Sequence, residues 1–143
     1  MLFDLGQGVT FMALDAATGQ PVWQARDPVS FLYSRPAHDP AAGLILAGAS
    51  NGQLFAYDAR TGQRRWDFAA DSPLESDPQV QSGIVYVTSQ NGTLYAIDSA
   101  TGRLLTNYLP GTAVLTNAPP LAAPGFVLTA HGYTLYALEA HTP

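Results

Sequence analysis

The chain has 143 residues, a net charge of −5, 47% apolar residues and neither lysine nor cysteine. This composition is typical of a folded domain rather than a disordered one, and the acidic balance predicts no nucleic-acid binding, which needs clustered basic side chains. The missing lysine and cysteine exclude Schiff-base lysines, Walker-type phosphate loops, disulfides, thiolate nucleophiles and zinc–thiolate sites.

The first residues predict strands of an incomplete unit. Residues 1–8 form a short apolar run that ends on glycine, and they lack the basic start and small-residue cleavage site of a signal peptide. Residues 9–15 predict a returning strand, residues 16–19 a turn, and Pro21-Val22-Trp23 a further strand. No apolar run in the chain approaches the ~20 residues that a membrane-spanning helix requires, so we expect no membrane span.

The second unit is complete and predicts four strands. Asn51-Gly52 lies between two apolar runs and indicates a two-residue hairpin turn in which both residues take positive φ. Residues 39–43 and Thr61-Gly62 predict the other two turns. The strands are expected at residues 31–35, 44–49, 53–58 and 65–68.

The third and fourth units follow the same order of strands and turns. In the third unit, strands are expected at residues 79–80, 84–89, 93–98 and 103–106, with a hairpin at Asn91-Gly92. In the fourth, they are expected at residues 119–121, 126–130 and 133–139. His131 occupies the Asn position of the hairpin and is interpreted as a turn variant, because histidine tolerates positive φ better than most residues.

An eleven-residue phrase, at residues 13–23 and 56–66, recurs in shorter form at 96–102 and 137–139. Its acidic positions are 15, 58, 98 and 139, so the period is about 40 residues. Four short strands per period, with no helical periodicity, predict an all-β fold: a β-propeller segment of about 3.5 to 4 four-stranded antiparallel blades. We interpret residues 1–143 as one propeller segment with repeat copies at about 1–26, 27–68, 69–109 and 110–143.

The motif residues are predicted to be structural. The acidic residue can accept hydrogen bonds from the turn amides, threonine can do likewise, glycine can take the left-handed conformation, and tryptophan can pack between neighbouring blades. The residues are Ala13, Asp15, Thr18, Gly19, Trp23, Ala56, Asp58, Thr61, Gly62, Trp66, Ala96, Asp98, Thr101, Gly102 and Glu139.

The phrase Ala-x-Asp-x-x-Thr-Gly-x-x-x-Trp after an Asn-Gly hairpin resembles the tryptophan-docking repeat of pyrroloquinoline-quinone-like propellers. Thr106 stands at the tryptophan position of the third copy, and Pro143 at the glycine position of the fourth. The resemblance implies one of two functions. Some members are quinone- and calcium-dependent dehydrogenases; others are non-catalytic, including an envelope lipoprotein that assists outer-membrane protein assembly and sensor or scaffold domains.

The residues favour the non-catalytic alternative. Asp71, Glu75 and Asp77 form an acidic cluster, which we interpret as a solvated loop rather than a calcium site. His38, His131 and His141 are scattered and match no catalytic or metal-binding spacing. We therefore expect no catalytic residue, no cofactor and no metal, and a binding or scaffolding module; the alternative is a fragment of a quinone-dependent dehydrogenase whose catalytic residues lie outside this chain.

The partner is expected to be a protein or a second copy of the chain. Residues 68–80 and 107–123 follow the repeat least and are the expected partner surfaces. An arc of blades leaves open edges, so the ring is expected to be completed by self-association or by further sequence. The resemblance suggests the bacterial cell envelope or another extracytoplasmic location.

Overall fold

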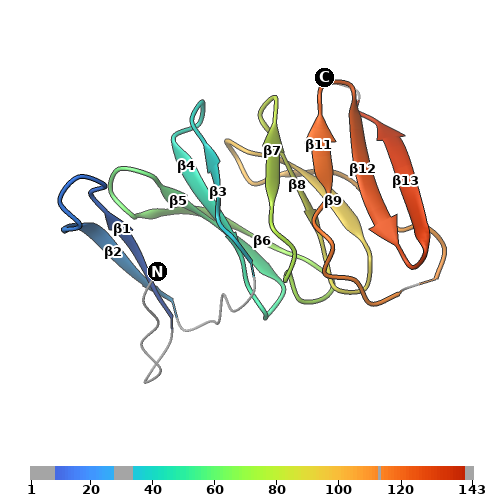
Figure 1. The fold of residues 1–143 in the computed structure, drawn as a ribbon, viewed down its shortest axis with the longest axis horizontal. Coiled ribbons are helices and arrows are strands. Elements are labelled where there is room, and N and C mark those ends of the chain that lie inside the picture. Colours follow the sequence, from blue (N-terminus) through green and yellow to red (C-terminus); the bar gives the residue numbers. More distant parts are fainter. Residues whose placement is uncertain (1–8, 28–33, 113, 141–143) are drawn as a thin grey trace.

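The computed structural model describes residues 9–27, 34–112 and 114–140, and these form only strands, turns and loops (Figure 1). The all-β prediction is confirmed. The strands are β1 (Val9–Leu14), β2 (Pro21–Asp27), β3 (Ala37–Asp39), β4 (Leu44–Gly48), β5 (Gln53–Asp58), β6 (Arg64–Ala69), β7 (Gln79–Gln81), β8 (Ile84–Thr88), β9 (Leu94–Asp98), β10 (Leu104–Tyr108), β11 (Leu121–Ala123), β12 (Phe126–His131) and β13 (Thr134–Glu139).

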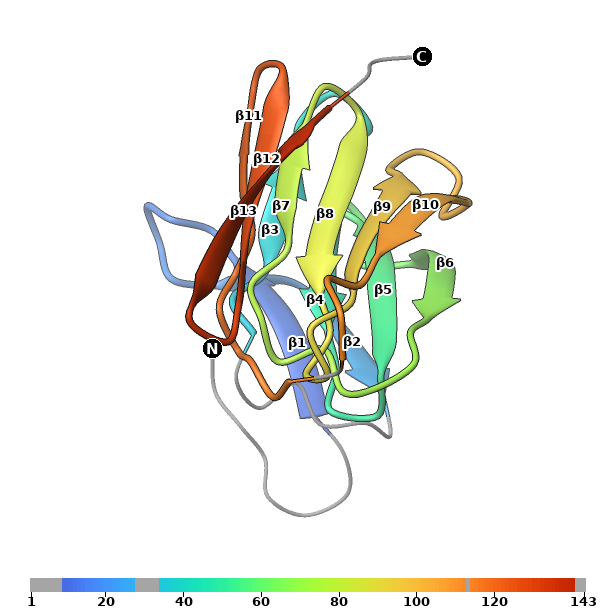
Figure 2. The same cartoon turned by 90° about the vertical axis from the view of Figure 1, so that its right-hand side faces the viewer.

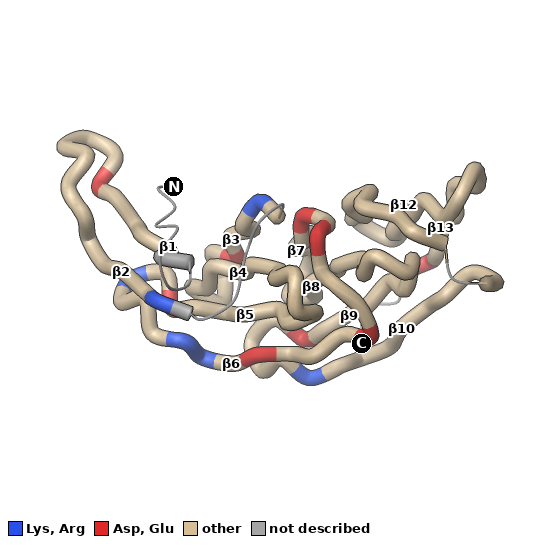
Figure 3. Tube along the Cα trace, turned by 90° about the horizontal axis from the view of Figure 1, so that it is seen from below, with Lys and Arg blue, Asp and Glu red and all other residues tan. Residues whose placement is uncertain are grey.

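The strands form four separate antiparallel sheets, each a meander in chain order. They comprise β1-β2, β3-β4-β5-β6, β7-β8-β9-β10 and β11-β12-β13. Figure 1 shows the sheets following one another across the molecule, and Figure 3 shows that together they trace an arc. The described residues do not close into a ring, and the prediction of a propeller segment is confirmed.

The strands are ordered from the inner to the outer side of the arc. The first strands of the second, third and fourth sheets lie on one side, since β3 contacts β7 and β7 contacts β11. Figure 2 shows the last strands, β6 and β10, on the opposite side. The middle strands of the second and third sheets are the most deeply buried, because a neighbouring sheet covers each of their faces, whereas buried and less buried residues alternate in β12.

The core lies between the sheets. All five residues of β8 are buried, as are four of the five in β9, so these strands read as continuous apolar runs rather than as an alternating pattern. The largest cluster joins the second and third sheets and includes Leu46, Leu54, Leu74, Val87 and Ile97. Burying a large aliphatic side chain contributes roughly 1.5–3 kcal/mol, so contacts between sheets hold the arc together.

The short first strands differ from the sequence-based expectation. Part of the strand expected at 31–35 lies outside the described residues, Ser34 and Arg35 are not in a strand, and β3 begins at Ala37. The strand expected at 119–121 is instead Leu121–Ala123. These predictions were wrong because Pro36, Pro119 and Pro120 lack the backbone N–H that a paired strand requires.

The Asn-Gly hairpins also differ from the prediction. The amide of Ala49 donates to Gln53 and that of Gly52 to Ala49, so the loop has three residues. Gly52 has φ of +84°, but Asn51 does not have a positive φ. The turn is therefore a type I turn followed by a left-handed glycine, and the asparagine accepts hydrogen bonds instead: Asn51 Oδ1 accepts the Gln53 amide at 3.1 Å.

The two-residue turn with two positive φ values occurs elsewhere, between β7 and β8. Ser82 has φ of +52° and Gly83 has φ of +76°, and Gln81 pairs directly with Ile84. Dihedrals of this kind define a type I′ turn, whose twist matches that of the flanking strands. The strands expected at residues 79–80 and 84–89 enclose this turn, but the sequence analysis did not assign its type.

Candidate functional site

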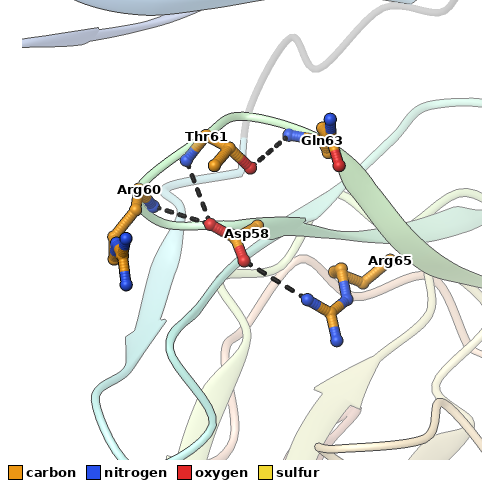
Figure 4. Close-up of polar contacts among 5 residues, drawn as sticks. All are labelled: Asp58, Arg60, Thr61, Gln63 and Arg65. Atoms are coloured by element: carbon orange, nitrogen blue, oxygen red, sulfur yellow. Dashed lines mark hydrogen bonds and ion pairs between the residues drawn. The ribbon is translucent and has the colours of Figure 1, made fainter.

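The repeat motif forms a closed hydrogen-bonded turn after β1, β5 and β9. Figure 4 shows the second copy, in which Asp58 Oδ1 accepts the amides of Arg60 and Thr61, both at 3.0 Å. Asp58 Oδ2 accepts from Arg65 at 3.3 Å, and Thr61 Oγ1 accepts the Gln63 amide at 3.4 Å. The carboxylate is thus used within its own turn.

The first and third copies repeat this geometry. Asp15 Oδ1 accepts the Thr18 hydroxyl and amide, both at 2.8 Å, and Asp98 Oδ1 accepts those of Thr101 at 2.7 and 2.8 Å. Hydrogen bonds to the charged form favour ionisation. The threonine hydroxyls therefore lower the pKa values of Asp15 and Asp98, while at Asp58 the Arg60 amide contributes most to lowering the pKa. Carboxylates with lowered pKa values are poor general bases at neutral pH.

The two tryptophans each dock onto the motif turn of the next sheet. Trp23 Nε1 donates to the carbonyl of Ala59, and Trp66 Nε1 donates to that of Ser99, both at 2.9 Å. Each indole lies on a glycine: a Cβ built on Gly62 would be 2.5 Å from the Trp23 ring, and one on Gly102 would be 2.6 Å from the Trp66 ring. The glycine therefore provides both the left-handed turn and the space for the ring.

The other motif residues lie in the same repeated frame. Ala13, Ala56 and Ala96 pair with the residue at the tryptophan position, which is Trp23, Trp66 or Thr106. Gly19 has φ of +70° but has nothing within 4 Å of a built Cβ. Glu139 ends β13 and pairs with Phe126. Thr142 and Pro143, like His141, lie outside the described residues.

The acidic cluster does not converge on a common point. Asp71 accepts hydrogen bonds from Ser89, Asn91 and Thr93, each at 2.8 Å. Burial raises the pKa of Asp71, but these bonds outweigh it and the pKa is lowered overall. Asp77 instead accepts the amide of Arg35 and Glu75 accepts from Gln90.

The calcium that the resemblance implies for the dehydrogenase members therefore does not fit these residues, and none of their contacts identifies a quinone site. Calcium requires six to eight converging oxygens, whereas within the described residues no three acidic or histidine side chains form a group able to hold a metal. We therefore assign no step to either group.

The interpretation of His131 as a turn variant was wrong. His131 is the last residue of β12, is buried, and packs its ring on Gly92 of the neighbouring sheet. It also contacts Tyr136 edge-on, at 6.5 Å between ring centroids. Gly132, not His131, takes the positive φ of this hairpin. His38 lies in β3.

Sequence reasoning missed two polar contacts that depend on residues far apart in the chain. The buried Asp39 binds the amides of Ala41 and Ala42, and its second oxygen accepts from Ser99 of the next sheet. The Ser76 hydroxyl donates to Thr88 at 2.6 Å and accepts the Thr88 amide. Asp39 reads as an ordinary turn residue in the sequence, and no local signal identifies its partner.

A cavity of about 390 Å³ lies between the third and fourth sheets. Its wall is mostly apolar and includes Tyr86, Leu94, Leu105, Val127 and Leu138. Thr106 and Ala140 also line it. This is the interface at which the tryptophan position holds threonine.

The comparisons with known proteins agree with this geometry. The sequence profile of the family described as outer membrane protein assembly factor BamB matches residues 7–142. The chain belongs to this family. Among curated protein sequences, none matches the chain significantly.

Solved structures share the fold of this BamB-family chain. BamB from Moraxella catarrhalis superposes with a TM-score of 0.71 at 23% identity, over 97% of this chain and 44% of that protein. The computationally designed Ika4 protein superposes with a TM-score of 0.76 at 18% identity, over 94% of this chain and 83% of the design. Quinohemoprotein alcohol dehydrogenase from Comamonas testosteroni superposes with a TM-score of 0.60 at 22% identity, over 71% of this chain and 18% of the enzyme. The chain thus spans less than half of this natural BamB, and the likenesses establish the fold.

Proposed function

We propose that this BamB-family chain is a non-catalytic binding or scaffolding module that contacts protein partners. The observation that carries the proposal is that the repeat's carboxylates bind the amides of their own turns and its indoles bind the neighbouring turn. Its most regular polar groups therefore stabilise the arc and do not converge on a reaction site. The family's description as an outer membrane protein assembly factor supports a role through protein contacts.

The last sheet and the segment before it offer the better of the two expected partner surfaces. Leu115 is 79% exposed and Leu135 on β13 is 67% exposed. In residues 68–80, by contrast, Leu74 and Ser76 are buried, and the Leu74 amide donates to Ala49 of the second sheet. Residues 68–80 therefore pack against the sheets. We propose residues 107–123 together with β13 as the docking surface.

Charge does not favour a particular class of partner. Figure 3 shows basic positions mainly in the first half of the arc, and over the last sheet the sequence has Glu139 alone among Asp, Glu and Arg residues. Within the described residues we find no helix that could cross a membrane. β13 is an edge strand of its sheet, and an exposed edge can accept a further strand by main-chain hydrogen bonding. We propose that residues 1–143 act as one propeller segment, completed by a second copy or by further sequence.

Light scattering on a size-exclusion column tests the docking surface. We expect a discrete dimer of the 15.1 kDa chain, because two arcs can complete each other's edges. The double variant Leu115→Lys/Leu135→Lys is expected to return the mass to that of the monomer, while Gln63→Lys, an exposed change on a motif turn, leaves it unchanged. A wild-type monomer at tens of micromolar would contradict self-association.

The superposition on the Comamonas testosteroni enzyme favours the dehydrogenase alternative. A separate experiment tests this alternative. We expect that pyrroloquinoline quinone titrated with calcium produces no saturable change in visible absorbance. A saturable change with one quinone per chain would contradict a non-catalytic module.

A further inference from the structure

The structure contains three equivalent interfaces between sheets, and only two are filled by a tryptophan. The equivalence follows from strand register, because Trp23, Trp66 and Thr106 each pair with a motif alanine directly after a β-bulge. The Thr106 hydroxyl reaches only the neighbouring Asn107 carbonyl, at 3.5 Å. Threonine is too short to span the gap that an indole fills elsewhere.

The acceptor side of the third interface is also equivalent. The carbonyls that receive the indole N–H belong to Ala59 and Ser99. The amides of these two residues donate to Gly43 and Gly83. The amide of Ala140 donates to Gly125 in the same way, at 3.1 Å. The Ala140 carbonyl therefore stands where the other two indole acceptors stand.

The cavity of about 390 Å³ joins these two positions, since both Thr106 and Ala140 line it. Its size is within the range of roughly 300–1,000 Å³ found for small-molecule sites, which are mostly apolar with a few polar groups. The lining residues with polar side chains are Tyr86, Thr106, Asn107, Tyr108 and Glu139. The described residues thus leave an apolar space at the place where two sister interfaces each hold an aromatic ring.

We propose that this cavity binds a small planar aromatic molecule carrying an N–H donor, of which indole is the simplest example. The occupant follows from the sister interfaces, where the same chain holds the same ring by apolar contact and one N–H bond to a turn carbonyl. The inference does not rest on the proposed scaffolding function, because it is argued from the two sister interfaces, although Tyr108 and Leu138 in the cavity wall belong to the segments proposed for docking.

Indole titrated into the ¹⁵N-labelled chain and followed by two-dimensional NMR tests the proposal. We expect saturable shifts in the amides of residues 104–108 and 138–140, with a Kd on the order of 0.1–1 mM for so small a ligand. 1-Methylindole lacks the N–H donor and should bind three- to tenfold more weakly. No saturable shift up to 5 mM indole, or shifts confined to other sheets, would overturn the proposal.

Variants at Thr106 distinguish indole binding in the cavity from indole adsorption on the protein surface. Thr106→Trp fills the cavity with an indole ring that belongs to the chain itself. This variant should therefore bind free indole at least tenfold more weakly, and its thermal midpoint should rise by several degrees. Gln63→Trp, at an exposed position on the motif turn of the second sheet, should change neither. If Thr106→Trp does not fold, Thr106→Leu partly fills the space and should weaken binding at least threefold. Unchanged indole affinity in the folded Thr106 variant would overturn the assignment.

Discussion

Adding one methyl group at Gly102 should lower the free energy of unfolding for two separate reasons: the positive φ of Gly102 and the Trp66 ring that lies against it. Gly102 has φ of +74°, and a Cβ there would lie 2.6 Å from the Trp66 ring. Gly19 has the same motif position and φ of +70°, but a Cβ there meets nothing within 4 Å. An L-residue in the left-handed conformation costs roughly 1–2 kcal/mol, and forcing extra volume into a packed site costs a further 1–3 kcal/mol or so.

We therefore expect Gly19→Ala to lower the free energy of unfolding by about 1–2 kcal/mol and Gly102→Ala by about 2–5 kcal/mol. Urea unfolding followed by far-ultraviolet circular dichroism, at one fixed protein concentration, measures both. In the Trp66→Ala background the ring is gone, so Gly102→Ala should cost no more than Gly19→Ala. Equal costs of the two glycine substitutions in the wild-type background would refute the reasoning, since they would show that the ring does not press on the glycine.

Three further predictions concern the polar contacts of the motif. Trp66→Phe keeps an aromatic ring but removes the N–H bond to Ser99, so we expect a loss of about 0.5–1.5 kcal/mol in urea unfolding; no loss would show that the bond contributes nothing. The Thr101 hydroxyl lowers the pKa of Asp98, so this stabilisation is complete above the unfolded-state pKa of about 4 and is lost as pH falls through the lower folded-state pKa. Between pH 5 and pH 3 the thermal midpoint of Asp98→Asn should therefore fall less than that of the wild type, and an equal fall would contradict the assignment. Ser99→Ala removes a donor from the buried Asp39 carboxylate and should cost about 1–3 kcal/mol; a variant with the wild-type urea midpoint would indicate that water replaces the hydroxyl.

The sequence predicted the repeated parts of the fold closely. β5 runs over the predicted residues 53–58, and β8 and β9 end within one residue of their expected bounds. These strands were predictable because both faces are buried, which makes them continuous apolar runs between strong turn residues. The first strands β3 and β11 were misplaced because each has only three residues and lies next to prolines, so it carries little periodic signal.

The repeat by itself determined the fold family and the order of the strands, because a period of about 40 residues can bury its apolar faces only by stacking like units. It also indicated Thr106 as the departure from the tryptophan position. Only the tertiary structure decided what that departure means. The partners of an inter-sheet contact lie about one period apart in the chain, as Trp66 and Ser99 do, so no local pattern shows whether the next sheet closes over a small residue or leaves a cavity. In this protein it leaves a cavity, because the neighbouring sheet keeps the spacing set by its own strands and turns.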